Sequence, residues 1–299
     1  MSETANLQTI RDWLRYAVSR FRSAGLFFGH GMQNAYDEAA YLILHTLHLP
    51  LDRIEPFLDA HLTPPECEAL NAVLRRRIEE RIPASYLTGE AWLGDYRFYV
   101  DERVIVPRSY FAELLDESLT PWIKDPEAVT DALDLCTGSG CLAIVMAHAF
   151  PNAHIDATDL SLEALEVAQR NISEYGLEGR VKTIHSDLFA NVHDRQYDLI
   201  ISNPPYVTEA AMRQLPPEYR HEPKPALAGG ADGLDVVRCI LGSASHHLKP
   251  NGILAVEIGH NRAIVEAAFP ELELTWLATS SGEDKIFMLG QDGLASILL

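Results

Sequence analysis

The spacing of hydrophobic residues divides the chain into a helical first part and a longer part in which strands and helices alternate. In the first part apolar residues recur every three or four positions from Leu7 and Ile10 onward, which is typical of amphipathic helices. The same spacing predicts a second helix over 35–47. A third helix is predicted from Pro64, because proline suits a first helical turn, to the residue before Pro83.

The segment 86–106 has a different pattern, rich in strand-forming residues and interrupted at Gly89 and at Gly94-Asp95. Such a segment predicts a β-hairpin. We therefore predict three parts: a helical domain over 1–85, a hairpin linker over 86–108 and an α/β domain over 109–299. The helical domain carries no chemistry-bearing motif, so docking of a substrate is our hypothesis for it. Ser109 is expected to cap a helix over 110–119.

Strands and helices alternate from position 129 to near the end of the chain. The predicted strands cover 130–136, 153–158, 181–185, 196–202, 251–258, 271–277 and 284–290. The predicted helices between them cover 140–149, 161–175, 234–248 and 261–268. This order is typical of an α/β fold with a doubly wound, mostly parallel seven-stranded sheet. Ligands of such sheets bind at the carboxyl ends of the strands.

Composition changes this picture only in part. The 299 residues, 47% hydrophobic and 22% charged, are ordinary for a globular enzyme. The start of the chain at Met1 shows no basic segment followed by an apolar one, and no long uncharged apolar run follows. We therefore expect neither a signal peptide nor a membrane span. The four cysteines lack Cys-x-x-Cys spacing, which favours reduced thiols and a cytoplasmic protein.

The charge of the chain is strongly acidic, with a formal value of −19 and a pI near 4.9. An acidic surface repels nucleic acid and attracts basic proteins, although acidity often serves solubility alone. The one tight basic run, Arg75-Arg76-Arg77, is followed by Glu79 and Glu80. We interpret it as an exposed helix face and expect no stable nucleic-acid binding.

A glycine-rich loop follows the first strand of the α/β part. It spans Asp134, Cys136, Thr137, Gly138, Ser139 and Gly140. Glycines permit a tight turn and close approach of a ligand to the backbone, and the following helix offers free N–H groups. The loop also fits the dinucleotide pattern G-x-G-x-x-[GA], so by itself it does not separate a dehydrogenase from a methyltransferase.

Two further strand ends carry carboxylates suited to an adenosine. Asp159, about 20 residues beyond the glycines, suits both ribose hydroxyls. It could instead cap the next helix, but Ser161 is available for that role. Asp187 follows the third strand and suits an adenine exocyclic amine, with Leu188 and Phe189 as apolar walls.

The fourth strand runs directly into Asn203-Pro204-Pro205-Tyr206. The prolines fix φ and lack N–H groups, so their carbonyls are left to accept hydrogen bonds. Asn203 adds an acceptor and two donors, and Tyr206 adds an aromatic face. The motif is suited to hold a planar –NH2 group. A plain strand-ending turn is the alternative interpretation of the motif. The motif also argues against a dehydrogenase, which would have no use for this group of acceptors.

With these motifs the sequence resembles the class I S-adenosylmethionine-dependent methyltransferases, and within them the protein glutamine methyltransferases. The likeness covers nearly the whole chain, including Glu222-Pro223, Ala226-Leu227 and the stretch 229–234. One branch of that family modifies peptide-chain release factors. The other modifies the third protein of the large ribosomal subunit.

The segment 106–114 distinguishes the branches. The release-factor branch usually has Pro-Arg-Pro-Asp-Thr-Glu there, and the ribosomal-protein branch has Pro-Arg-Ser-Pro-Ile-Ala-Glu-Leu. This chain keeps Ser109, Ala112, Glu113 and Leu114 but has Tyr110-Phe111 where Pro-Ile is usual. It therefore resembles the ribosomal-protein branch more closely, and a release factor remains the alternative substrate.

The resemblance implies S-adenosylmethionine as cofactor, no metal, and a basic ribosomal protein as partner, without a membrane. We assign to the cofactor site Asp134, Cys136, Thr137, Gly138, Ser139, Gly140, Asp159, Leu160, Asp187, Leu188, Phe189 and Asn203. We assign catalysis and substrate binding to Asn203, Pro204, Pro205 and Tyr206, with Arg108 also at the substrate. The same four-residue motif occurs in methyltransferases that act on the exocyclic amine of adenine. Methylation of nucleic acid is therefore the alternative function from another substrate class. His246 and His247 are expected to be surface or packing residues.

Overall fold

The computed structural model describes residues 4–295, which form two compact units. Of the described residues, the first unit contains 4–91, 100–102 and 216–221, and the second contains 92–99, 103–215 and 222–295. We expect no signal peptide at the start of the chain, and residues 1–3 lie outside the described residues. Residues 216–221 belong to the first unit although the residues on either side of them belong to the second, and the sequence analysis did not predict this excursion.

The first unit is helical, as the apolar spacing predicts. Its helices are α1 (Ile10–Ser23), α2 (Ala35–Thr46), α3 (Pro64–Arg75) and α4 (Ala84–Thr88), with a π-helical turn, Arg76–Glu80, directly after α3. Capping boxes start α1 at Thr9 and α3 at Thr63, and Pro64 occupies the first turn of α3. Trp13, Phe21 and Leu42 are among the fully buried side chains of its core.

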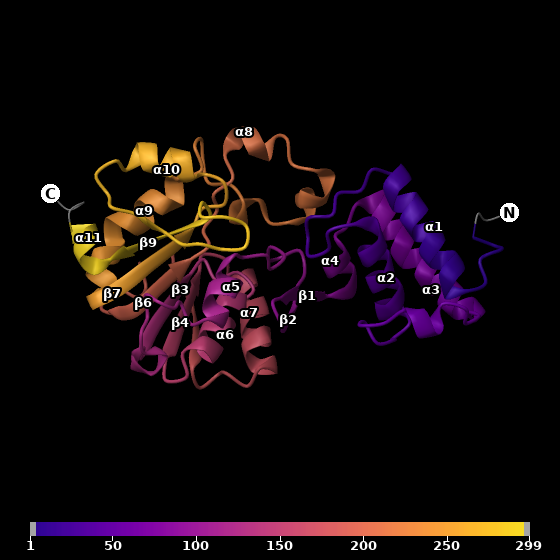
Figure 1. Cartoon of the computed structure of the whole chain (residues 1–299), viewed down its shortest axis with the longest axis horizontal. Helices are drawn as coiled ribbons and strands as arrows, with labels where there is room; N and C mark the ends of the chain where they lie inside the picture. The colour runs from indigo at the N-terminus through magenta and orange to yellow at the C-terminus, as the bar shows by residue number, and fades with distance from the viewer. Residues whose placement is uncertain (1–3, 296–299) are drawn as a thin grey trace. The chain divides into compact units, whose positions relative to one another are not determined.

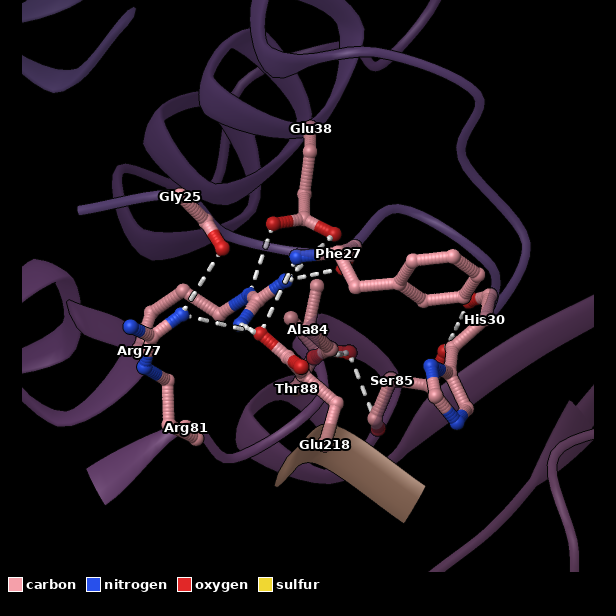
Figure 2. Close-up of polar contacts among 10 residues, drawn as sticks. All are labelled: Gly25, Phe27, His30, Glu38, Arg77, Arg81, Ala84, Ser85, Thr88 and Glu218. Carbon is pink, nitrogen blue, oxygen red and sulfur yellow. Dashed lines mark hydrogen bonds and ion pairs between the residues drawn. The ribbon is translucent and has the colours of Figure 1, made fainter. Parts of the chain in front are cut away.

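The expectation that the basic run is an exposed helix face is wrong for Arg77. Arg75 and Arg76 are exposed, but the Arg77 side chain is only 1% exposed. Its Nε donates to Glu38 at 2.7 Å and its Nη2 to the carbonyl of Phe27 at 2.9 Å (Figure 2). A buried guanidinium needs such partners, and removing one of a buried ion pair costs about 3–5 kcal/mol.

Glu218 completes this buried cluster from the segment 216–221 (Figure 2). Its Oε1 accepts hydrogen bonds from Arg77, Arg81 and the N–H of Phe27, at 3.3, 3.3 and 3.1 Å. Burial opposes its ionisation, but the Phe27 N–H and the Arg77 guanidinium outweigh burial and lower the pKa of Glu218. Burial raises the pKa of Glu38 on the other side of Arg77.

The predicted hairpin is present but shorter than expected. Residues 84–88 form α4, which ends at Gly89 with φ of 68°, and the strands are β1 (Glu90–Leu93) and β2 (Tyr96–Tyr99). Gly94, with φ of 57°, turns the chain between them. The apolar residues after β2 are buried without forming a strand, so the linker prediction extended the strand pattern too far.

The second unit is built on a seven-stranded sheet in the order β5-β4-β3-β6-β7-β9-β8. The strands are β3 (Asp131–Leu135), β4 (His154–Asp159), β5 (Val181–His185), β6 (Tyr197–Ser202), β7 (Leu248–Glu257), β8 (Thr275–Trp276) and β9 (Ile286–Gly290). The pairings from β5 to β7 are all parallel, and β9 is antiparallel to both β7 and β8. The predicted doubly wound, mostly parallel sheet is confirmed.

Helices cover both faces of this sheet (Figure 1). The helices in the described part of this unit are α5 (Phe111–Asp116), α6 (Cys141–Ala149), α7 (Leu162–Glu174), α8 (Glu209–Met212), α9 (Asp235–Ala244), α10 (Arg262–Ala268) and α11 (Gln291–Ala295). Alternate residues of each central strand face the two layers. On β6, Leu199 and Ile201 pack with α5 and α6, whereas Ile200 packs with α9. Burial on both sides explains why the strands are continuous apolar runs.

Candidate active site

The sheet register brings the sequence motifs together at one edge. Leu135 pairs with Thr158 on one side and with Ser202 on the other, and Ser202 pairs with Val256. The residues that follow these pairs therefore lie side by side at the carboxyl ends of their strands. The strand order reverses between β4-β3 and β3-β6, which is the switch point where doubly wound sheets bind ligands.

The glycine-rich loop adopts the tight turn predicted for it. Cys136, Gly138 and Gly140 have φ of 62°, 55° and 78°. A Cβ on Gly140 would lie 3.1 Å from the Cβ of Ala168 on α7, so glycine lets the loop pack closely there. Thr137 and Ser139 are buried. The side chain of Thr137 donates to Asp134, and the Ser139 carbonyl accepts from Asn171.

Asp134 is completely buried beneath this loop. Its Oδ2 accepts from the Thr137 hydroxyl at 2.6 Å and from the Ala143 N–H at 3.0 Å. Its Oδ1 is buried without a hydrogen-bond partner among residues 4–295. Burial raises the pKa of Asp134 to about 7. An acceptor left over at a glycine-rich loop is suited to a ligand that carries a hydrogen-bond donor.

Asp159 ends β4 beside the loop, as expected. Its carboxylate accepts from the N–H of Gly138 and from the N–H of Ser161, each at 2.9 Å. The Ser161 hydroxyl accepts from the Ala164 N–H and caps α7, so Asp159 is not needed as the cap. Leu160 is 64% exposed, which is unusual for leucine and places an apolar surface next to Asp159.

The third predicted contact lies on a cavity of about 360 Å³. Asp187, Leu188, Phe189 and Ala190 form one side of it, and Cys239, Ser243 and His247 form the other. The Phe189 ring stacks on His247 with centroids 4.4 Å apart. The contribution of α9 was not predicted, because only its amphipathic pattern marks it in the sequence. His247 is a packing residue, as expected.

Asn203 follows β6 and is half-buried. Within residues 4–295 its side-chain amide makes no hydrogen bond, so its acceptor and donors remain available to a ligand. Pro204 is buried, and Pro205 and Tyr206 are half-buried. The motif thus presents a polar amide on a rigid, partly buried turn.

The position of Tyr206 is set by residues that the sequence analysis missed. The side-chain Nδ2 of Asn261 donates to the Tyr206 carbonyl at 2.7 Å. A Cβ on Gly259 would lie 2.6 Å from the Tyr206 ring, and one on Gly233 would lie 2.4 Å from its carbonyl oxygen. Both glycines have positive φ. For Gly259 the available signal was its position after the end of β7.

Arg108 lies against Glu222. Its Nη1 and Nη2 donate to the two carboxylate oxygens of Glu222 at 2.5 and 2.8 Å, and Glu222 also accepts from the Val106 N–H. This bidentate pair orients the guanidinium. Its assignment to substrate binding stays a prediction.

Ser109 and Glu257 form a second buried pair at the same edge. The Ser109 hydroxyl donates to Glu257 at 2.6 Å and accepts from the Phe111 N–H. The predicted cap and helix over 110–119 are wrong in position, because α5 begins at Phe111 with Tyr110 as its N-cap and ends at Asp116. Glu257 ends β7 and was missed from sequence, although an acidic residue at a strand end was a usable signal. Burial raises its pKa to about 7.

This raised pKa gives a pH-dependent prediction. Because folding raises the pKa of Glu257 from 4.5, its contribution to stability is complete below about pH 4.5 and is lost as pH rises through about 7. Glu257→Gln has no proton to lose, so at pH 8 it should be more stable than the parent by on the order of 1 kcal/mol.

Urea unfolding at about pH 5 and pH 8 measures this difference. Glu113→Gln, at an exposed carboxylate of α5, is the control and should show no such gain. An equal effect of Glu257→Gln at both pH values would contradict the assignment.

Two family models match the chain. The "PrmC N-terminal domain" model matches residues 12–89, and the "Methyltransferase small domain" model matches residues 114–215. A ribosomal protein uL3 glutamine methyltransferase of Neisseria meningitidis serogroup B is 60% identical over 288 residues, covering 96% of this chain and 95% of the relative. One of Burkholderia pseudomallei is 57% identical, covering 97% of each.

The chain belongs to the family of ribosomal protein uL3 glutamine methyltransferases. Among solved structures, the hMettl16 catalytic domain, determined in complex with a 3′UTR hairpin, aligns with a TM-score of 0.51. It covers 76% of this chain and 81% of that one at 12% identity, which supports the class I methyltransferase fold and nothing finer.

The site of this uL3 glutamine methyltransferase family member fits S-adenosylmethionine, the cofactor of class I methyltransferases. The unpartnered oxygen of Asp134 suits a cationic donor such as the cofactor's ammonium group, and the Asp159 carboxylate suits ribose hydroxyls. Within the described part of the chain, no helix combines the length and apolarity needed to span a membrane.

Proposed function

We infer that this protein transfers the methyl group of S-adenosylmethionine to the side-chain amide nitrogen of a glutamine in ribosomal protein uL3. The observation that carries this inference is an Asn-Pro-Pro-Tyr turn beside the cofactor loop, in a chain 56–60% identical to several uL3 glutamine methyltransferases over nearly their whole length.

The chemistry asks the protein mainly to position the amide. An amide nitrogen is a poor nucleophile because its lone pair is delocalised, whereas the cofactor supplies an activated methyl group on sulfur. The Asn203 side-chain carbonyl and the Pro204 backbone carbonyl accept the two amide hydrogens and favour the developing positive charge on nitrogen. Tyr206 packs on the flat amide and offers its π-face to the cationic centre.

Alignment supplies much of the rate. Holding both reactants in line contributes on the order of 7–11 kcal/mol in favourable cases. The backbone geometry that this requires is supported by Asn261 and Gly259, which hold Tyr206 in place. No strong base enters the mechanism, because the amide proton becomes acidic as the new bond forms.

The acidity of the chain supports a basic protein as substrate. A formal charge of −19 attracts a basic ribosomal protein before RNA covers it, and repels DNA or RNA. The residues Ser109 and Glu113 belong to the ribosomal-protein pattern, which adds support. A ribosomal substrate is in keeping with a cytoplasmic enzyme. Release factors remain the alternative substrate.

The test is to incubate the enzyme and labelled S-adenosylmethionine separately with three acceptors. These are uL3 from cells lacking its methylation, release factors from such cells, and unmethylated DNA. We expect label in uL3, at a glutamine identified by mass spectrometry. Preferential labelling of release factors would overturn the choice of branch, and labelling of DNA would overturn the substrate class.

A further inference from the structure

The segment that follows the catalytic motif makes an excursion into the helical unit. After Tyr206 the chain stays in the second unit through Leu215, joins the first unit at 216–221, and returns at Glu222. The excursion interrupts a chain that otherwise builds the sheet. Its contacts within the helical unit are specific and buried.

Glu218 is the centre of these contacts. Its side chain is completely buried, and its Oε1 accepts from two guanidinium groups and one backbone N–H (Figure 2). The guanidinium of Arg77 is itself buried, and Arg81 also donates to the carbonyls of Ala24 and Gly25. All the donors come from residues far from Glu218 in the sequence.

The neighbours of Glu218 strengthen the same anchorage. The Tyr219 ring lies 4.5 Å from His30 and 5.7 Å from Phe27, measured between ring centroids. His221 bonds the carbonyl of Glu80 at 2.8 Å through Nε2 and pairs with Glu102 through Nδ1. The segment is thus held by ionic, aromatic and backbone contacts within one unit.

Such a buried charge cluster is a poor device for stability alone. Taking charges out of water is costly, and well-packed hydrophobic residues usually serve stability as well or better. Charges accept few geometries, however, because each must meet its partners. The cluster therefore specifies where the segment lies.

Contacts within the methyltransferase unit flank the excursion. Before it the Asn261 amide holds the Tyr206 carbonyl, and after it Glu222 is bound by Arg108. Residues 207–221 link the catalytic motif along the chain to an anchor in the helical unit. A segment that is already ordered by such contacts needs no ordering when a protein substrate binds.

We propose that Glu218 is a positioning residue for methyl transfer to a protein substrate, acting by anchoring the segment after Asn-Pro-Pro-Tyr in the helical unit. The proposal rests on the proposed function and deepens it. It gives the helical unit a defined part in the reaction, namely to hold the segment next to the catalytic motif. Glu218 itself takes no part in chemistry.

Glu38 provides a matched control. Glu218 and Glu38 are both buried carboxylates bound to the same Arg77, but Glu38 lies on α2 and outside the excursion. Glu218→Gln and Glu38→Gln both remove one charge from one cluster. Only the first loosens the segment that leads back to Tyr206.

The first measurement is hydrogen exchange of the intact protein, which needs no acceptor substrate. We expect Glu218→Gln to raise exchange in 207–221, with Glu38→Gln leaving this segment close to the parent. The second is steady-state methylation of uL3. Glu218→Gln should lower kcat/KM roughly tenfold or more, because small misplacement of reacting groups is costly, while S-adenosylmethionine affinity stays unchanged.

Equal exchange and equal kcat/KM in the two variants would overturn the proposal, since a merely stabilising cluster predicts that result. If Glu218→Gln does not fold, Tyr219→Leu is the second variant, because it removes ring contacts of the same segment and keeps the charges. It should likewise raise exchange in 207–221 and lower kcat/KM. If the parent fails to methylate uL3, the proposed function fails, and the exchange comparison still tests the anchor.

Discussion

Asn203→Ala is expected to reduce methyl transfer by a factor of about 100 or more, because removing one acceptor that acts on developing charge typically costs this much. Asn203 is half-buried at the end of β6, and within residues 4–295 its amide is committed to no other group. Truncation should therefore remove the interaction with the substrate amide without disturbing a structural hydrogen bond.

Two measurements make this result specific. Single-turnover methylation of uL3 reports the chemical step, and calorimetry with S-adenosylmethionine should show nearly unchanged affinity. Asn152→Ala removes a surface amide that donates to the Glu127 carbonyl and serves as the control. Near-normal turnover of Asn203→Ala would show that the acceptor arrangement is not the catalytic device.

Asp159→Ala should weaken S-adenosylmethionine binding by roughly tenfold to a hundredfold, the range for loss of charged hydrogen bonds. The carboxylate lies at the end of β4, where it also accepts from the Gly138 N–H of the glycine-rich loop. Its loss should therefore affect both the ribose contact and the shape of the loop. Calorimetry on the folded variant measures the change in affinity.

Ser161→Ala separates the two readings of Asp159. It removes the cap of α7 and leaves the carboxylate in place, so it should lower stability and spare cofactor affinity. Should Asp159→Ala bind the cofactor as tightly as the parent, the residue would be structural and the ribose assignment would be withdrawn.

The fold was largely predictable because its signals are local. Alternating apolar strands and amphipathic helices predicted all seven strands of the sheet, and Pro64 marked the start of α3. The edge strand was overestimated: 271–277 was predicted, but only Thr275–Trp276 pairs in the sheet. Apolar residues near an edge are buried by packing as readily as by strand pairing, and sequence pattern does not separate the two.

The candidate site was predictable in its motifs but not in its supports. The glycine-rich loop, Asp159, Asp187 and Asn203 each stand at the end of a strand or just after it, so their shared edge follows from parallel pairing. Asn261 and the α9 side of the cavity carry no comparable local mark, and Glu257 has only its place at the end of a strand. The role of Glu257 is defined by a partner distant in the chain, Ser109, which is 148 positions away.

By itself, the sequence determined the strand and helix order, the tight turn before α6, and the rigid Asn203-Pro204-Pro205-Tyr206 turn. These depend on φ preferences, side-chain periodicity and caps within a few residues. Only the tertiary structure decided that Arg77 is buried rather than exposed, and that Glu218 joins the segment 216–221 to the helical unit. A charge is buried only where partners surround it, and here Arg77 and Glu218 stand 141 positions apart.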